Sequence, residues 1–329
     1  MHTINTTNFN IRTDLIIEKE QFSSLEKTTI TKKNYSIIRQ HTNSNDYITI
    51  SFEDITDKDN YKEIENIFIN ELKQVIRKHK VQKEDLILII GLGNSKSTPD
   101  SLGPKVINNV LVTSHLYKLG EVENTYQNTS AFKPDVTGTT GIETSDIVKN
   151  LITTTNAKMV IVIDALASSS IKILNKTIQI TDAGIEPGSG VGNNRQALNM
   201  SELDIPVIAI GVPTIVEAST IVSETIQYLK QQISYKLDHY NDPKEKLIKA
   251  NDYSKHQESL SEDQKTQILG EIGKLDNNEL KQLISEVLDP IKYNLMVTPK
   301  EIDYLIDKLS MLIGNGINKS LHDQFNPTK

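Results

Sequence analysis

Two kinds of apolar pattern alternate along the chain and together predict an α/β fold. Short stretches of consecutive or alternating apolar residues predict β-strands over residues 47–52, 86–90, 159–164, 176–181 and 206–211. Between them, apolar residues recur every three or four positions, as they do in amphipathic helices. We therefore expect a three-layer fold, in which a mostly parallel, twisted sheet is flanked by helices.

The predicted helices have recognisable starts. One begins near Tyr61, and a second has Pro104 in its first turn, where the missing N–H of proline costs nothing. Further helices are expected at 145–153 and 215–229. "TPKE", residues 298–301, predicts an N-cap threonine and a capping box, followed by an apolar stripe. The C-terminal part is therefore expected to be a helical extension.

Changes in polarity suggest the domain boundaries. Residues 1–60 are polar and weakly patterned, and they suggest an arm or small subdomain that holds one strand. The composition becomes charged after about residue 234, and 241–261 resembles a linker. We expect an α/β domain up to residue 240 and a helical portion over 241–329.

Charge and composition narrow the function classes. The net charge of −7 opposes a nucleic-acid partner or an anionic membrane surface, both of which need clustered lysine and arginine. The chain has no cysteine, which excludes disulfides and thiolate chemistry. Neither a signal peptide nor an apolar run of membrane-spanning length is recognisable. A cytoplasmic location is expected.

Two aspartates follow predicted strands at one edge of the sheet. The turn Gly91–Gly93 resembles a nucleotide-binding turn, but the third glycine of that motif is missing and Asp100 follows instead. Asp164 ends the strand 159–164. Carboxylates about 4 Å apart repel by roughly 4 kcal/mol, so such a pair retains one proton and can activate water. Alternatively, Asp100 caps the next helix or turn, and Asp164 merely ends its strand.

A glycine-rich loop, "EPGSGVGNNR" at residues 186–195, offers backbone N–H groups for an oxyanion. Its candidate residues are Gly188, Ser189, Gly190 and Gly192. Arg195 could hold a substrate carboxylate. A surface turn with a solvated arginine explains the same pattern.

His115 is the one candidate metal ligand near the glycine turn, and we expect it on the helix that follows this turn. A histidine in this setting is more often a surface or core residue. The sequence contains no His-Glu-x-x-His motif and no Gly-x-Ser-x-Gly motif, so zinc-protease and serine-hydrolase sites gain no support.

Several motifs occur in the order found in one family. They are "GLGNSKSTPDSLGPKV", "TGTTGIETSDIV", "VIDALASSS", "TIQITDAGIEPGSGVGNNR", "IPVIAIGVPTIVEAST" and "NLMVTPKEID". Together they resemble the spore germination protease family, over residues 8 to 322. The resemblance implies an endopeptidase that starts the degradation of small acid-soluble spore proteins. It also implies a fold similar to hydrogenase maturation proteases, an atypical aspartate mechanism with Asp100 and Asp164, and no cofactor.

The resemblance further implies a self-processing zymogen. Residues 1–14 would be a propeptide, cut between Asp14 and Leu15 within "FNIRTDLIIE". Ile16 stands where many relatives have alanine, and its bulk could slow processing. A homotetramer that acts in the forespore or spore core is implied as well.

The chain departs from the family pattern where basic residues are common, at Ser114, Ser169 and Asn194. Their loss could alter substrate choice. Two other functions stay open. One is a metal-assisted endopeptidase that uses both aspartates with His115, and the other is a non-catalytic binder of acidic spore proteins.

Overall fold

The computed structural model describes residues 14–19, 25–42, 44–122, 125–186, 196–243, 253, 256–288 and 295–325. These residues fall into two compact units. The sheet unit contains the described residues within 12–168, 172–215 and 298–329, and the helical unit contains those within 169–171 and 216–297. The domain boundaries expected from the sequence stay predictions.

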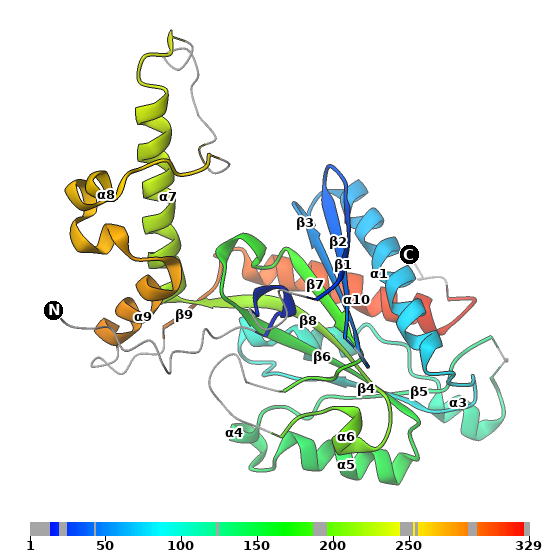
Figure 1. Cartoon of the computed structure of the whole chain (residues 1–329). Helices are drawn as coiled ribbons and strands as arrows, with labels where there is room; N and C mark the ends of the chain where they lie inside the picture. Colours follow the sequence, from blue (N-terminus) through cyan, green and yellow to red (C-terminus); the bar gives the residue numbers. More distant parts are fainter. Residues whose placement is uncertain are drawn as a thin grey trace. The chain divides into compact units, whose positions relative to one another are not determined.

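A mixed sheet forms the centre of the sheet unit (Figure 1), and the order of its strands is β1-β2-β3-β7-β8-β6-β4-β5. The strands are β1 Lys27–Thr31, β2 Tyr35–His41, β3 Asp46–Phe52, β4 Ile87–Gly91, β5 Thr129–Phe132, β6 Met159–Ser168, β7 Thr177–Thr181 and β8 Val207–Glu217. β4 pairs in parallel with β5 and β6. The other half of the sheet is antiparallel, with the neighbouring pairs β1–β2, β2–β3, β3–β7 and β7–β8. The α/β class is confirmed, but the sheet is mixed rather than mostly parallel.

Three strands of the antiparallel half come from the polar N-terminal part of the chain. β1, β2 and β3 form successive hairpins, and β3 joins the main sheet through β7. Ile48 and Ile50 on β3 alternate with polar residues and point into the core beside Ile178 and Ile180. The expectation of a separate arm is therefore wrong for residues 27–52, because these strands are part of the main sheet. The sequence does not predict β1 as a strand, because β1 is exposed along its whole length and has no apolar pattern.

Helices cover both faces of the sheet (Figure 1). The larger core lies between the sheet and the helices α1 (Lys58–Lys78), α2 (Leu102–Ile107) and α10 (Ile302–Leu321). The smaller core lies under α5 (Thr144–Thr155) and α6 (Met200–Leu203). This is the three-layer arrangement that the alternating pattern predicted.

The last helix, α10, belongs to the sheet unit and packs directly on α1. Gly316 of α10 lies so close to the ring of Phe68 that a β-carbon there would collide with it. The predicted capping box at the start of α10 is wrong. The Thr298 hydroxyl instead donates to the carbonyl oxygen of Thr214 (2.8 Å), and Glu301 occupies the N-cap position without a side-chain cap.

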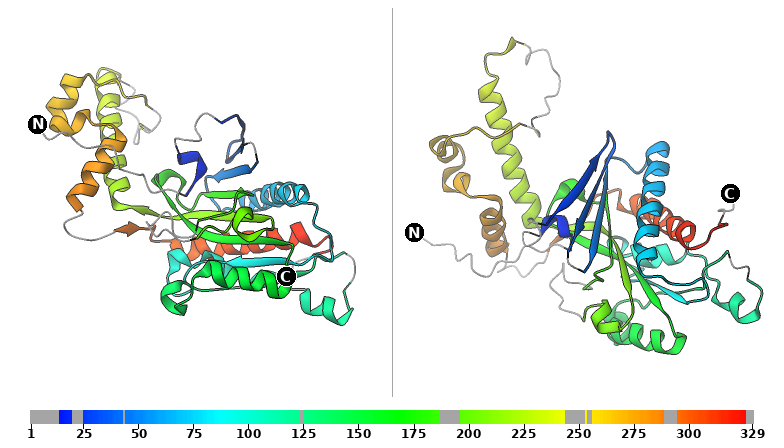
Figure 2. Two further views of the ribbon diagram at one scale, coloured as in Figure 1. Left: turned by 60° about the horizontal axis from the view of Figure 1, so that its bottom comes forward. Right: turned by 45° about the vertical axis from the view of Figure 1, so that its right-hand side comes forward.

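The helical unit contains α7 (Ala218–Asp238), α8 (Glu262–Leu269), α9 (Asn277–Leu288) and the short strand β9 (Met296–Val297), which pairs with the end of β8. α9 packs against α7 (Figure 2). The remaining elements are α3 (Ser114–Leu119), α4 (Thr137–Thr140) and the 3₁₀ turns η2 (Ile16–Glu18), η4 (Thr98–Asp100), η5 (Ile171–Ile173) and η9 (Gly270–Lys274). Within the described ranges, no helix is both long and apolar enough to cross a membrane.

A partly buried ion cluster joins the end of α1 to β3 and to the end of β7. Lys78 Nζ lies 2.7 Å from Asp182 Oδ2 and 3.0 Å from Asp46 Oδ2, while the backbone N–H of Asp46 donates to Asp182 Oδ1 (2.7 Å). Burial alone would raise the pKa of Asp182. The donors His79, Lys78 and the Asp46 N–H outweigh it and lower this pKa to about 2.

Asp182→Asn is therefore expected to lower the free energy of unfolding by about 2 kcal/mol at pH 7. The folded-state pKa lies below the ordinary value of 3.8, so the stabilisation is complete above that value and is lost between about pH 4 and pH 2. Urea unfolding at pH 7 and pH 3 measures the difference. Asp307→Asn is a suitable control, because Asp307 pairs with Lys105 at the surface and is 61% exposed. If Asp182→Asn lowered the free energy of unfolding equally at pH 7 and pH 3, the prediction would be contradicted.

Candidate functional site at the sheet edge

The glycine turn after β4 is built around Asp100. Gly93 has a φ of 107°, which favours glycine, and a β-carbon on it would collide with the backbone oxygen of Asp100. Asp100 lies at the end of η4, and its Oδ2 accepts the backbone N–H of Asn94 (2.8 Å). The turn therefore encloses the carboxylate of Asp100, which explains why it lacks the third glycine of a nucleotide-binding motif.

Asp164 lies within β6, which extends four residues beyond the predicted strand. Its side chain is nearly buried, at 7% exposed, and its Oδ1 accepts the backbone N–H of Ala165 (2.9 Å). The residue therefore does not end a strand.

The two segments that carry the aspartates are neighbours. Gly91 is paired with Ile163 in the parallel ladder, and the N–H of Leu92 donates to the oxygen of Ile163 (2.8 Å). η4 and α2 also contact β6. Asp164 therefore directly follows the residue to which the glycine turn is bonded, and Gly93 of that turn contacts Asp100. The interpretation of Asp100 and Asp164 as one catalytic pair stays a prediction.

The N-terminal segment 14–19 lies along the outer end of β6. Asp14 and Ala167 exchange two hydrogen bonds: the Asp14 N–H donates to the Ala167 oxygen (3.2 Å), and the Ala167 N–H donates to Asp14 Oδ2 (3.0 Å). The Ser168 hydroxyl donates to Glu18 Oε1 (3.0 Å). Leu15 and Ile16 are buried, at 0% and 3% exposed. The predicted cleavage position, Asp14–Leu15, thus lies beside the outer end of the strand that carries Asp164.

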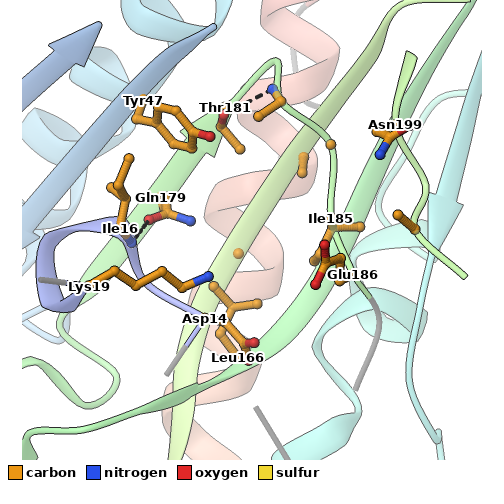
Figure 3. A pocket seen from close by; sticks show the side chains of 15 residues that line it. Asp14, Ile16, Lys19, Tyr47, Leu166, Gln179, Thr181, Ile185, Glu186 and Asn199 are labelled. Atoms are coloured by element: carbon orange, nitrogen blue, oxygen red, sulfur yellow. Dashed lines mark hydrogen bonds between the residues drawn. The ribbon is translucent and has the colours of Figure 1, made fainter. Parts of the chain in front are cut away.

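A cavity of about 240 Å³ adjoins this segment, as Figure 3 shows. Asp14, Ile16 and Lys19 line one part of it, and Tyr47 and Gln179 line another. The Gln179 side chain points at Ile16, whose N–H donates to Gln179 Oε1 (2.8 Å; dashed in Figure 3). The sequence did not single out Gln179, because a polar residue in an alternating strand is ordinarily solvent-facing.

Several expected site residues lie elsewhere. Residues 188, 189, 190, 192 and 195 of the glycine-rich loop, and Asn194, lie outside the described residues. His115 is exposed on α3 rather than on the helix that follows the glycine turn. Among the described residues, no group of three or more His, Asp or Glu side chains is placed to hold a metal ion. The ligand set of the metal-assisted alternative is therefore not assembled in this part of the chain.

The position of one lost basic residue has a basic neighbour in the fold. Ser169 follows β6 and belongs to the helical unit, where its backbone carbonyl oxygen accepts a hydrogen bond from Lys281 Nζ (2.7 Å). Lys281 is buried, at 4% exposed. A lysine distant in sequence therefore supplies positive charge beside Ser169.

Comparison with known proteins gives one consistent result. A family model described as germination protease matches residues 3–329. The germination protease of Bacillus mycoides (strain KBAB4) is 40% identical over 98% of this chain and 96% of its own length. That of Bacillus cereus (strain G9842) is 44% identical over 84% and 78%, respectively. That of Geobacillus sp. (strain WCH70) is 38% identical over 98% and 96%.

Proposed function

Because this chain belongs to the germination protease family, we propose that it is an aspartate-dependent endopeptidase that starts the degradation of small acid-soluble spore proteins. Family membership makes it a protease of spore germination. The proposal adds the substrate, the mechanism and activation from a zymogen. The observation that carries it is the hydrogen bond from Leu92 to Ile163, because it holds the loop of Asp100 against the strand of Asp164.

The proposed reaction is hydrolysis by a carboxylate pair. The ionised member takes a proton from a water molecule, whose oxygen attacks the carbonyl carbon of the scissile bond, while the protonated member donates to the carbonyl oxygen. When the C–N bond breaks, the nitrogen receives a proton. One fragment then ends in a new carboxyl group, and the other begins with a new amino group. Because the two groups titrate together, the acid and base roles belong to the pair.

The proposed zymogen step is cleavage between Asp14 and Leu15. The docking of residues 14–18 along β6 supports it, since this segment brings an acidic residue followed by aliphatic residues to the strand that carries Asp164. The expected homotetramer, the location in the spore core and the oxyanion role of the loop at 188–192 belong to the same proposal.

Incubation of the pure chain at mildly acidic pH is expected to yield a new N-terminus at Leu15. N-terminal sequencing detects the cut, and mass spectrometry of a digested small acid-soluble spore protein reports activity and site preference together. A chain that keeps Met1 and leaves the substrate whole after long incubation would contradict the proposal and favour a binding protein. Cleavage that stops after exhaustive EDTA treatment and returns with one metal would contradict the metal-free mechanism.

A further inference from the structure

The segment 14–18 is held by contacts that recognise a peptide backbone. At Asp14, the N–H is bonded to the oxygen of Ala167, as in a strand pair. At Ile16, the N–H is bonded to Gln179 Oε1, which replaces the main-chain acceptor of a neighbouring strand. Contacts to main-chain atoms are available to any extended peptide, as in other cases of strand addition.

The position of Gln179 makes it a fixed acceptor. Its neighbours on β7, Ile178 and Ile180, point into the larger core, so its side chain emerges on the opposite face of the sheet. It is itself 7% exposed. A nearly buried amide on a central strand loses little conformational freedom when it accepts a hydrogen bond, which favours binding.

Side-chain contacts in the same groove favour a particular peptide sequence. The Ala167 N–H accommodates an acidic side chain, because a carboxylate oxygen is a strong acceptor for a backbone donor. Leu15 comes next and is completely buried, which favours a large aliphatic residue. The Ser168 hydroxyl donates to Glu18, a second acidic residue. The groove thus fits an acidic residue followed by aliphatic ones.

We propose that this groove, made by Ala167 and Ser168 of β6 and Gln179 of β7, binds the substrate peptide, and that residues 14–18 occupy it in the uncut chain. After the cut at Asp14–Leu15, residues 15–18 are the new N-terminus and must leave the groove before a substrate peptide can enter. Gln179 is the positioning residue, because it accepts the N–H of the second residue after the acidic one. The ligand class is an extended peptide with an acidic residue before an aliphatic pair. This inference rests on the proposed function and names the residues that select its substrate.

The first test needs no proteolysis. In the full chain carrying Asp164→Asn, Gln179→Met should make the amide hydrogens of residues 14–18 exchange about tenfold faster, because methionine fills a similar volume but offers no comparable acceptor. Gln282→Met is the matched control. Gln282 is equally buried, at 6% exposed, but lies in the helical unit. Unchanged exchange in Gln179→Met would overturn the groove assignment.

The second test uses the processed enzyme and the peptide Asp-Leu-Ile-Ile-Glu, a copy of residues 14–18. The peptide should inhibit substrate cleavage competitively, and N-methylation at its first isoleucine should weaken inhibition five- to tenfold. In Gln179→Met, methylation should have almost no further effect, because the bond is already lost. For the substrate, this variant should raise KM by a similar factor and change kcat less than twofold. Equal methylation effects in both enzymes would overturn the proposal.

The two tests separate this inference from the proposed function. A wild-type chain that never cuts itself or its substrate, but shows the predicted exchange pattern, would sink the protease mechanism and leave the groove as a peptide-binding site. A chain that cuts normally at Asp14–Leu15, with no effect of Gln179→Met in either test, would retain the mechanism and sink the groove.

Discussion

Asp100→Asn and Asp164→Asn are each expected to lower the rate of peptide cleavage about a thousandfold or more, with the fold unchanged. Asparagine has nearly the same shape as aspartate, and its amide oxygen can still accept the N–H groups of Asn94 and Ala165. It can neither take a proton from water nor share one with a second carboxylate. The loss should appear in kcat, because the groove that binds the peptide is left intact.

The test compares single-turnover rates of substrate cleavage in both variants and in the double variant. If the carboxylates act as one pair, the double variant should be hardly worse than either single one. Asp146→Asn, at the exposed start of α5, serves as a control and should leave the rate unchanged. Near wild-type activity in either single variant would reject the paired mechanism. Losses that multiply in the double variant would indicate independent roles.

Between pH 6.5 and pH 4, the protein is expected to lose about 3 kcal/mol of unfolding free energy through one histidine. His322 follows α10 and is 2% exposed, and its Nδ1 accepts the backbone N–H of Gln127 (3.1 Å). Burial, and then the charge of Lys83, lower its pKa from 6.5 to about 4. A protonated ring would lose the hydrogen bond from Gln127.

The folded state thus keeps His322 neutral, whereas the unfolded chain protonates it below pH 6.5. Its contribution is complete above that pH and lost as the pH falls to about 4. Urea unfolding between pH 7 and pH 4.5 should show a flatter pH dependence for His322→Gln, which retains an acceptor but does not titrate. His115→Gln, on the exposed surface of α3, should follow the wild type. An unchanged slope in His322→Gln would rule out this assignment.

Apolar periodicity predicted the parts of the fold that bury continuous apolar surface. The strands around Ile89 and Ile161 and the helix around Phe68 lie where the sequence placed them, since all three residues belong to the larger core. The pattern failed where burial is one-sided or absent. β1 is exposed along its whole length, so only its hydrogen bonds to β2 reveal it as a strand. The side chain of Thr298 is suited either to an N-cap or to a hydrogen bond with a distant carbonyl, and only the fold decides between them.

The candidate site was predicted less completely, because its parts meet only through long-range packing. The alternating pattern placed Asp100 and Asp164 at one sheet edge, but spacing could not show that Leu92 bonds to Ile163. The role proposed for the two aspartates rests on the resemblance to a family. Gln179 gave no signal, since its importance depends on a peptide segment more than 160 residues away in sequence.

The contact between α1 and α10 joins two segments that are far apart along the chain. α10 follows every other described element, yet its residues Leu309, Leu312 and Ile313 complete the core that α1 and α2 share. A chain whose synthesis stops before α10 therefore lacks one side of the larger core. Such a truncated chain would leave the apolar stripe of α1 exposed to water.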